Sequence, residues 1–388
     1  MQSEAPPSPR IERITLKDIG PFDGASFAPL PPTGPGELVL FEGPNGSGKT
    51  TILEAIAALI GSPFGPLSQG ASAAPVSSLQ RRARADSAFI ALDFTSKCRA
   101  RSGVMVGLTK WSGEPRLVSR IQGLEAAAGT NEPTDWAAFA FRGAQPTANL
   151  ATEGPKRIER AALRGALSFA EVFPASAELG QILVNIYFDH LHAWRSAEQA
   201  KGTPAEPALR RQADALQASL DRFAHALTEV LERKVTIDFV PGQRPPVIRL
   251  DGEIIPLDLL GEGFRRTLAW LSDLVARLEL TPWKDPSRSP FDQDFWLLLD
   301  EIDQSLHPAL QRRILPTLRR LFPNARIYAT THSPFVVASA PDGCVFPIRP
   351  DPRTHRVSGA VAPIKLGPGH SLAWAVEEVF DVPSSFVD

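Results

Sequence analysis

A glycine-rich loop near the start of the chain has the residue types and spacing that bind phosphate. Residues 43–50 match the pattern G-x-x-x-x-G-K-[ST]. Glycines let the backbone wrap closely around an anion, so that successive N–H groups point at it. Lys49 is expected to reach the β- and γ-phosphates of a nucleoside triphosphate, and Thr50 to be a ligand of Mg²⁺. The predicted binding residues are Gly43, Pro44, Asn45, Gly46, Ser47, Gly48, Lys49, Thr50 and Thr51.

Two adjacent carboxylates later in the chain predict a reaction as well as binding. Asp300 and Glu301 follow the apolar run 295–299. An acidic residue at the end of a buried strand can hold Mg²⁺, so Asp300 is a predicted metal ligand. Glu301 could polarise an attacking water as a general base. Alone, the pair could also mark the solvent edge of a strand, but the glycine loop upstream favours the catalytic interpretation.

The elements predicted around these residues would bring them together. Alternating apolar residues predict a strand over 11–19, and short apolar runs predict strands over 37–42, 295–300 and 325–330. Residues 51–60 predict a helix, so the glycine loop would lie between a strand and a helix N-terminus, whose dipole favours anions. This context argues against a chance match in a glycine-rich turn. The continuous apolar run at 295–300 is typical of a parallel sheet buried on both faces.

Periodicity predicts the remaining elements. Two helices, over 179–200 and about 209–230, are separated by a Gly-Thr-Pro break. The heptad-like spacing of the second helix is compatible with a coiled coil, but its short length favours packing within a domain. Residues 120–149 show no clear pattern. The other predictions are strands over 88–94, 103–109, 235–240 and 247–250, and helices after Gly263 and over 308–322.

Composition limits the class of protein. The chain has 388 residues, of which 43% are hydrophobic and 22% charged, values that exclude a mostly disordered chain. The formal net charge of −2 excludes a surface that coats nucleic acid throughout, although a local contact stays open. The absence of a signal-like or membrane-spanning apolar run, together with only two cysteines, Cys98 and Cys344, predicts a soluble cytoplasmic protein without a disulfide framework.

Three motifs together resemble a known family. They are Gly43-Pro-Asn-Gly-Ser-Gly-Lys-Thr-Thr51, Leu298-Leu-Asp-Glu-Ile-Asp303 followed by Leu306-His-Pro308, and Ala329-Thr-Thr-His-Ser-Pro334. They are similar to the ABC-type ATPase heads of the SMC, RecF and OLD group, and most of all to its compact bacterial AAA-family members, many of which belong to antiphage defence systems. The resemblance covers about residues 11–60 and 235–340. It implies an α/β P-loop NTPase fold, a two-lobed head with a mixed β-sheet and a helical insertion.

The resemblance assigns roles to residues around the triphosphate. His332 matches the switch histidine that contacts the γ-phosphate, although a histidine at this position could also merely cap a turn. Asp303 begins the D-loop, residues 303–307, which crosses a dimer interface in this family. A glutamine of the first lobe usually senses Mg²⁺, and Gln80 is the candidate here, on a loose alignment.

Residues 261–263 align with the signature motif, which closes over the nucleotide held by the opposite subunit. The motif here consists of Gly261, Glu262 and Gly263, with Gly261 in place of the usual serine, so one hydroxyl donor is missing. The N-terminal amides of the following helix could grip a phosphate. The alternative is a plain helix start. The departure from the family pattern predicts weak or partner-dependent dimer closure.

The resemblance implies three parts and a function for the whole. Residues 1–150 and 234–388 are expected to form the two ATPase lobes, and residues 151–233 the helical insertion. The expected cofactors are ATP and Mg²⁺, and the expected assembly is a head-to-tail homodimer or a higher even oligomer. About 56 residues follow His332, too few for the nuclease domain of OLD proteins, which favours a regulatory ATPase that controls a separate effector in a bacterial defence system.

Two other functions stay open. One is a DNA repair or recombination ATPase of the RecF or SMC type, and the other is a nucleotide-bound scaffold with negligible turnover. The near-neutral charge counts against the first, and the intact Asp300–Glu301 pair against the second. Arginines of the predicted helix 308–322 are expected on its solvated side rather than in a DNA-binding patch. They are Arg312, Arg313, Arg319 and Arg320.

Overall fold

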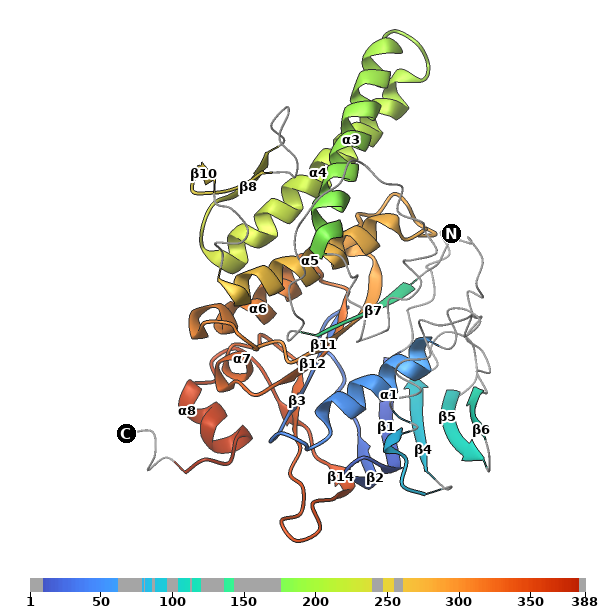
Figure 1. Ribbon diagram of the computed structural model, residues 1–388, viewed down its shortest axis with the longest axis vertical. Helices are drawn as coiled ribbons and strands as arrows, with labels where there is room; N and C mark the ends of the chain where they lie inside the picture. Colours follow the sequence, from blue (N-terminus) through green and yellow to red (C-terminus); the bar gives the residue numbers. More distant parts are fainter. Residues whose placement is uncertain are drawn as a thin grey trace.

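A six-stranded core sheet organises the molecule. The computed structural model describes residues 10–61, 79, 81–85, 88–95, 104–111, 114–119, 136–142, 176–238, 247–254 and 261–383. The core sheet has the order β15-β13-β3-β12-β11-β7, in which β15 is antiparallel to β13 and the other neighbours are parallel (Figure 1). Its strands are β3 (Glu37–Glu42), β7 (Trp136–Arg142), β11 (Asp294–Asp300), β12 (Arg326–Thr331), β13 (Cys344–Pro347) and β15 (Ile364–Lys365).

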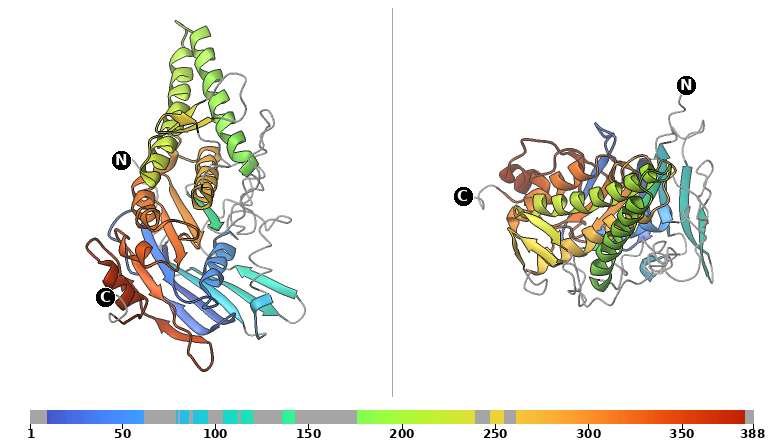
Figure 2. Two further views of the ribbon diagram at one scale, coloured as in Figure 1. Left: turned by 60° about the vertical axis from the view of Figure 1, so that its left-hand side comes forward. Right: turned by 90° about the horizontal axis from the view of Figure 1, so that it is seen from above.

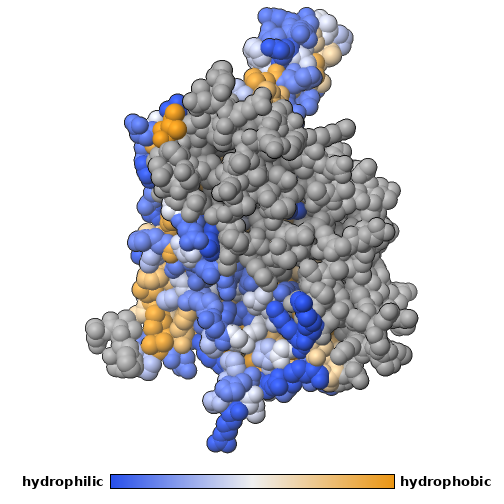
Figure 3. Space-filling view, viewed as in Figure 1, coloured by the Kyte–Doolittle hydropathy of each residue, from blue (hydrophilic) through white to orange (hydrophobic). Residues whose placement is uncertain are grey.

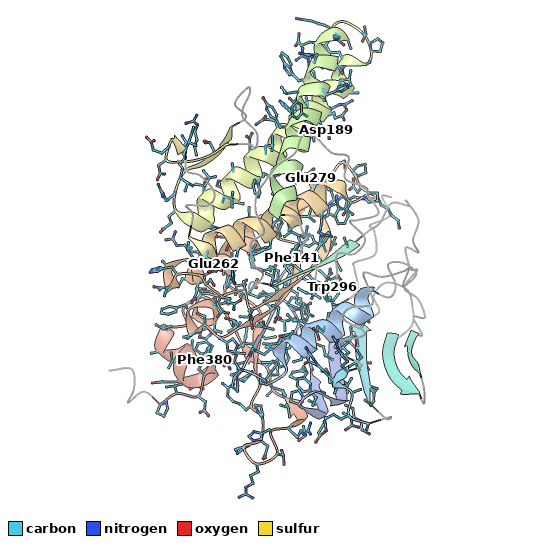
Figure 4. All side chains as sticks on the ribbon, in the orientation of Figure 1. Phe141, Asp189, Glu262, Glu279, Trp296 and Phe380 are labelled. Carbon is cyan, nitrogen blue, oxygen red and sulfur yellow. The ribbon has the colours of Figure 1, made fainter. Side chains whose placement is uncertain are left out.

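Both faces of this sheet are covered, as the continuous apolar runs predict. Successive residues of β3 join different cores: Leu38 packs with the helices on one side, and Val39 with α1 and a second sheet on the other. Helices α5 (Glu262–Leu280) and α6 (Pro308–Leu321) lie over the first face, and α1 (Lys49–Gly61) over the second. Every residue of β3 and β12 is buried. Trp296 of β11, labelled in Figure 4, is fully buried in this sheet.

The second sheet also has six strands, in the order β14-β2-β1-β4-β5-β6, and α1 lies between the two sheets (Figure 2). Its neighbouring strands are antiparallel, except that β14 runs parallel to β2. Its strands are β1 (Arg10–Ile19), β2 (Phe22–Phe27), β4 (Phe89–Thr95), β5 (Val104–Trp111), β6 (Glu114–Ser119) and β14 (Val357–Val361). Strands from both predicted lobes therefore share each of the two large sheets.

A helical hairpin projects from the head, formed by α3 (Ser176–Gln199) and α4 (Glu206–Leu231) (Figures 1 and 2). The base of α4 packs into the core through Phe223 and Leu227, as the preference for packing within a domain predicts. The large apolar residues Leu191 and Trp194 of α3 do not lie in the core, because they are 37% and 51% exposed. Small residues of α3, including Ala193, are buried instead, because two helices pack closely where side chains are short.

Short elements complete the described chain. A small sheet follows the hairpin, with β8 (Val235–Asp238), β9 (Val247–Leu250) and β10 (Glu253–Ile254). The later part contains a 3₁₀ turn (Pro290–Asp292), α7 (Pro334–Ala338), α8 (Leu372–Trp374) and a π-helical turn (Ala375–Val379). On the face shown in Figure 3, the described residues are mostly hydrophilic, and apolar residues gather near α8. Among the described helices, none is both long and apolar enough to cross a membrane.

The end of the core sheet opposite the glycine loop contains a buried carboxyl group. Glu37 is 3% exposed and accepts a hydrogen bond from the Tyr328 hydroxyl at 3.1 Å. Burial raises the pKa of Glu37 to about 7, and the Tyr328 bond and the nearby Arg326 only partly offset that effect. Near neutral pH this carboxyl group is therefore partly protonated in the folded protein.

We expect Glu37→Gln to remove a pH dependence of stability. Because the pKa of the folded state lies above the ordinary 4.5, the protonated group stabilises the fold at low pH, and that contribution is lost as pH rises through about 7. The loss should approach about 3 kcal/mol of unfolding free energy. Urea unfolding at pH 5 and pH 8 tests this, with the exposed Glu12→Gln as control. A wild-type-to-variant difference that is equal at both pH values would contradict it.

Candidate nucleotide site

The glycine loop joins the end of β3 to the start of α1 at one edge of the core sheet. Gly48 has a φ of +97°, and a Cβ at this position would lie 2.5 Å from the Phe22 ring, so only glycine fits here. The Ser47 hydroxyl is buried and has no hydrogen-bond partner within the described chain. A buried orphan hydroxyl inside a loop of this type fits an anion as its partner.

Lys49 lies inside the loop that precedes it. Its Nζ donates to the carbonyl oxygens of Gly43 and Pro44, at 2.8 and 3.0 Å. The residue is 7% exposed, and burial lowers its pKa, while nearby carboxylates, first among them Glu42 and then Asp300, oppose that shift. The ammonium group is thus held by backbone oxygens at the centre of the loop, where it is available to a phosphate.

Thr50 and Asp300, which are 250 residues apart in sequence, meet at the sheet edge. The Thr50 Oγ1 donates to both carboxylate oxygens of Asp300, at 3.1 and 3.0 Å. The contact forms because β3, β12 and β11 are parallel neighbours and end at the same edge, where open α/β sheets bind ligands. A hydroxyl and a carboxylate are the oxygen donors that Mg²⁺ prefers, so the pair fits this ion.

Thr330, at the end of β12, links the two predicted carboxylates. Its hydroxyl donates to Asp300 Oδ1 at 2.8 Å and accepts from the backbone N–H of Glu301 at 2.7 Å. Thr330 is fully buried, and Glu301 has a φ of +56°, unusual for a residue other than glycine. Thr330 is not among the residues predicted from the sequence, although it lies within the motif of residues 329–334 that contains His332.

His332 and Asp303 lie beside this group. The backbone N–H of His332 donates to Asp303 Oδ1 at 3.1 Å. Burial lowers the pKa of His332, the nearby Lys49 ammonium lowers it further, and the carboxylates, led by Asp303, oppose the shift. The imidazole is therefore neutral near pH 7. The structure thus brings Lys49, Thr50, Asp300, Asp303 and His332 to one sheet edge.

The predicted signature residues lie at the start of α5. They are far from the glycine loop in sequence, and Gly263 lies next to the D-loop in space. Gly261 is the N-cap and makes no side-chain cap bond, and Glu262 is exposed and pairs with Arg266 (Figure 4). Gly263 is buried, and a Cβ here would lie 2.0 Å from the Ser305 carbonyl oxygen. Close packing on the D-loop of the same chain therefore explains why residue 263 is a glycine.

The predicted Mg²⁺-sensing residue, Gln80, lies outside the described residues. Arg82, two residues later, contacts the start of α1. It donates to Thr51 Oγ1 at 2.6 Å and pairs with Glu54 at 2.9 Å, so it braces the first turns of α1.

Family comparisons agree with this geometry. Residues 132–338, more than half of the chain, match a family described as "AAA domain, putative AbiEii toxin, Type IV TA system". The chain belongs to this AAA-domain family. Residues 13–119 match a second family, described as "AAA domain", so the AAA assignment extends over the segment that contains the glycine loop.

Curated relatives of this AAA-domain protein include retron and Septu proteins. It is 29% identical over 153 residues to the retron Ec83 probable ATPase of Escherichia coli, covering 37% of this chain and 27% of that protein. It is 32% identical over 132 residues to the retron Vc95 probable ATPase of Vibrio cholerae, covering 34% and 24%. It is 32% identical over 90 residues to the Septu protein PtuA of Bacillus thuringiensis, covering 23% and 22%. The matched part spans about a quarter of each relative.

Solved structures relate the AAA-domain protein to SMC heads. The "SmcHead bound to the C-winged helix domain of ScpA" aligns with a TM-score of 0.50 at 15% identity, covering 92% of this chain and 98% of that one. At this identity the likeness concerns the fold alone. The predicted fold class, a P-loop α/β head with mixed sheets, is confirmed.

Proposed function

We propose that this chain is a Mg²⁺-dependent ATPase that acts as a dimerising switch. The observation that carries the proposal is the contact of Thr50 with Asp300 beside the buried Lys49. A hydroxyl, a carboxylate and an ammonium group at the end of parallel strands, next to a glycine loop and a helix N-terminus, suit a nucleoside triphosphate. Membership of the AAA-domain family and the names of the retron relatives support the same activity.

The residues of this chain have separate roles in ATP binding and hydrolysis. The loop N–H groups and Lys49 bind the phosphates, with Lys49 exchanging its carbonyl partners for phosphate oxygens. Thr50 and Asp300 would hold Mg²⁺, which would neutralise charge on the phosphates. Glu301 orients the attacking water and accepts its proton. His332 is neutral near pH 7 and donates a hydrogen bond to the γ-phosphate. Gln80 stays the candidate for sensing the metal.

We further propose a head-to-tail homodimer, or a higher even oligomer, in which each copy closes the other's site. Gly261 and Glu262 are exposed at the start of α5, where backbone N–H groups can meet a partner's phosphate. Asp303 and the rest of the D-loop would cross the same interface. In this proposal residues 1–150 and 234–388 act as the two lobes, with 151–233 as the insertion.

For the biological role, we propose a regulatory ATPase that controls a separate effector in a bacterial defence system. The retron and Septu relatives support this role. A DNA-directed role has less support, because three α6 arginines are engaged in ion pairs: Arg319 with Asp342, Arg313 with Glu232, and Arg320 with Glu229. Those charges are partly neutralised, which weakens attraction to phosphate backbones.

Steady-state turnover of the purified protein tests the proposal. Phosphate release from ATP is expected with Mg²⁺ and is expected to stop in excess EDTA, and Lys49→Ala should remove both turnover and binding of labelled ATP. Size measurement in ATP should show a larger species that ADP does not support. Binding without turnover would instead favour a nucleotide-bound scaffold, and stimulation by DNA would favour the repair-type alternative.

A further inference from the structure

Gln311, near the start of α6, bonds to two segments that the proposed function treats separately. Its Nε2 donates to the carbonyl oxygens of Asp303 and Leu306, at 3.1 and 2.9 Å, and both belong to the D-loop. Its Oε1 accepts from the Ser333 hydroxyl at 2.5 Å. Ser333 directly follows the switch histidine, so one side-chain amide spans the D-loop and the switch turn, residues 331–334.

The D-loop is held from other sides as well. Gly263 packs against the Ser305 carbonyl, which places the D-loop next to the start of α5. Asp303 accepts the backbone N–H of His332, a second link to the switch turn. Ser305 has a φ of +62°, a conformation that persists in a non-glycine residue only when its surroundings hold it. The D-loop conformation therefore depends on these contacts.

We propose that Gln311 is a positioning residue that couples the D-loop to the switch histidine. The inference rests on the proposed function, in which the D-loop meets the partner and His332 meets the γ-phosphate. Both amide N–H groups and the amide oxygen are used, and the amide is planar, so the carbonyls of the D-loop and the Ser333 hydroxyl have one preferred spacing. A partner that shifts the D-loop must then shift the switch turn with it.

As a mechanistic consequence, docking of the partner at the D-loop and contact of His332 with the γ-phosphate influence each other. Coupling between sites requires a contiguous element whose position both sites bias. Gln311 supplies that element through two kinds of hydrogen bond. The D-loop carbonyl oxygens accept from its amide nitrogen, and the Ser333 hydroxyl donates to its amide oxygen. A substitution can therefore remove one link and keep the other.

Gln311→Glu removes the link to the D-loop and keeps the link to Ser333. It keeps the length and an acceptor for Ser333, but it replaces Nε2 with a carboxylate oxygen that cannot donate to the two D-loop carbonyls and repels them. We expect turnover at saturating ATP to fall about tenfold or more, equivalent to about 1.4 kcal/mol in the barrier. Binding of labelled ADP should stay within about twofold of wild type, because Gln311 does not touch the glycine loop or Lys49 in the described contacts. Gln212→Glu, exposed on α4, is the matched control for the charge change.

The two readouts separate positioning from folding. A merely structural role would lower turnover and ADP binding together, in proportion to the unfolded fraction seen in thermal melts. If Gln311→Glu fails to fold, Gln311→Met, which lacks both links without adding charge, replaces it. Turnover within twofold of wild type in a folded variant overturns the inference alone. Absence of turnover in the wild type overturns the proposed function, and the inference with it.

Discussion

Replacing Glu301 with glutamine should leave nucleotide binding intact and lower ATP turnover by about two to four orders of magnitude, the range that a general base contributes. Glutamine keeps the size of the side chain and can still orient a water molecule, but it cannot accept a proton. The backbone N–H of Glu301, which bonds to Thr330, is unchanged, so the local fold should persist. Phosphate release and labelled-ATP binding, measured on the same preparation, check the result.

The same variant should accumulate as an ATP-bound dimer, because closure is then no longer relieved by hydrolysis. Size measurement in ATP should show a dimer fraction above that of wild type, and addition of EDTA should disperse it. Glu253→Gln, exposed on β10, provides a matched control outside the site. A Glu301→Gln protein that hydrolyses ATP at the wild-type rate would remove Glu301 as the base and leave binding as the remaining function.

Thr330→Val should lower turnover by about ten- to a hundredfold, since it removes the hydroxyl that bonds both Asp300 and Glu301. Valine has nearly the same shape, so packing at this fully buried position is preserved. The buried Asp300 oxygen and Glu301 N–H lose a partner, which should also cost about 1–3 kcal/mol of stability. The Mg²⁺ concentration for half-maximal turnover should rise, because Asp300 loses one of the bonds that orient it.

Thr330→Ser separates the hydroxyl from the methyl group in this prediction. The serine variant keeps the donor and the acceptor and should recover most of the turnover and the ordinary Mg²⁺ requirement, even if it is somewhat less stable. Equal turnover in the valine and serine variants would show that the Thr330 hydroxyl does not position the carboxylates. Titration of Mg²⁺ against phosphate release distinguishes this effect from a general loss of folded protein.

Local patterns were sufficient to predict most of the elements around the site. The glycine loop of residues 43–50, the apolar run before Asp300 and the alternation over 11–19 are each contained in a short segment, and the structure places them as predicted. β7 escaped prediction, because its small and aromatic residues have no clear period. Its role as a strand depends on pairing with β11, more than 150 residues away, which no local pattern reveals.

The residues missed within the site have a related cause. Thr330 and Gln311 act through side-chain bonds to distant or backbone groups, so residue type and spacing carry little signal for them. The α6 arginines were predicted on the solvated side, which is wrong for Arg319, because its side chain is only 10% exposed and pairs with Asp342. The structure also adds acidic partners from the region of α4, such as Glu229 for Arg320. Such pairs depend on the mutual placement of helices, which the sequence pattern does not specify.

The position of β3 in the core sheet has a consequence for biosynthesis. This strand carries the glycine loop, and its two neighbours are β12 and β13, which come about three hundred residues later. Until those two strands have been synthesised, the backbone N–H and C=O groups along both edges of β3 have no native partner and its apolar faces stay uncovered. Non-local pairing of this kind is slow and leaves surface that can aggregate. The nucleotide site of this protein can therefore form only after β12 and β13 have been synthesised, so the glycine loop must wait for distant strands before it is held in place.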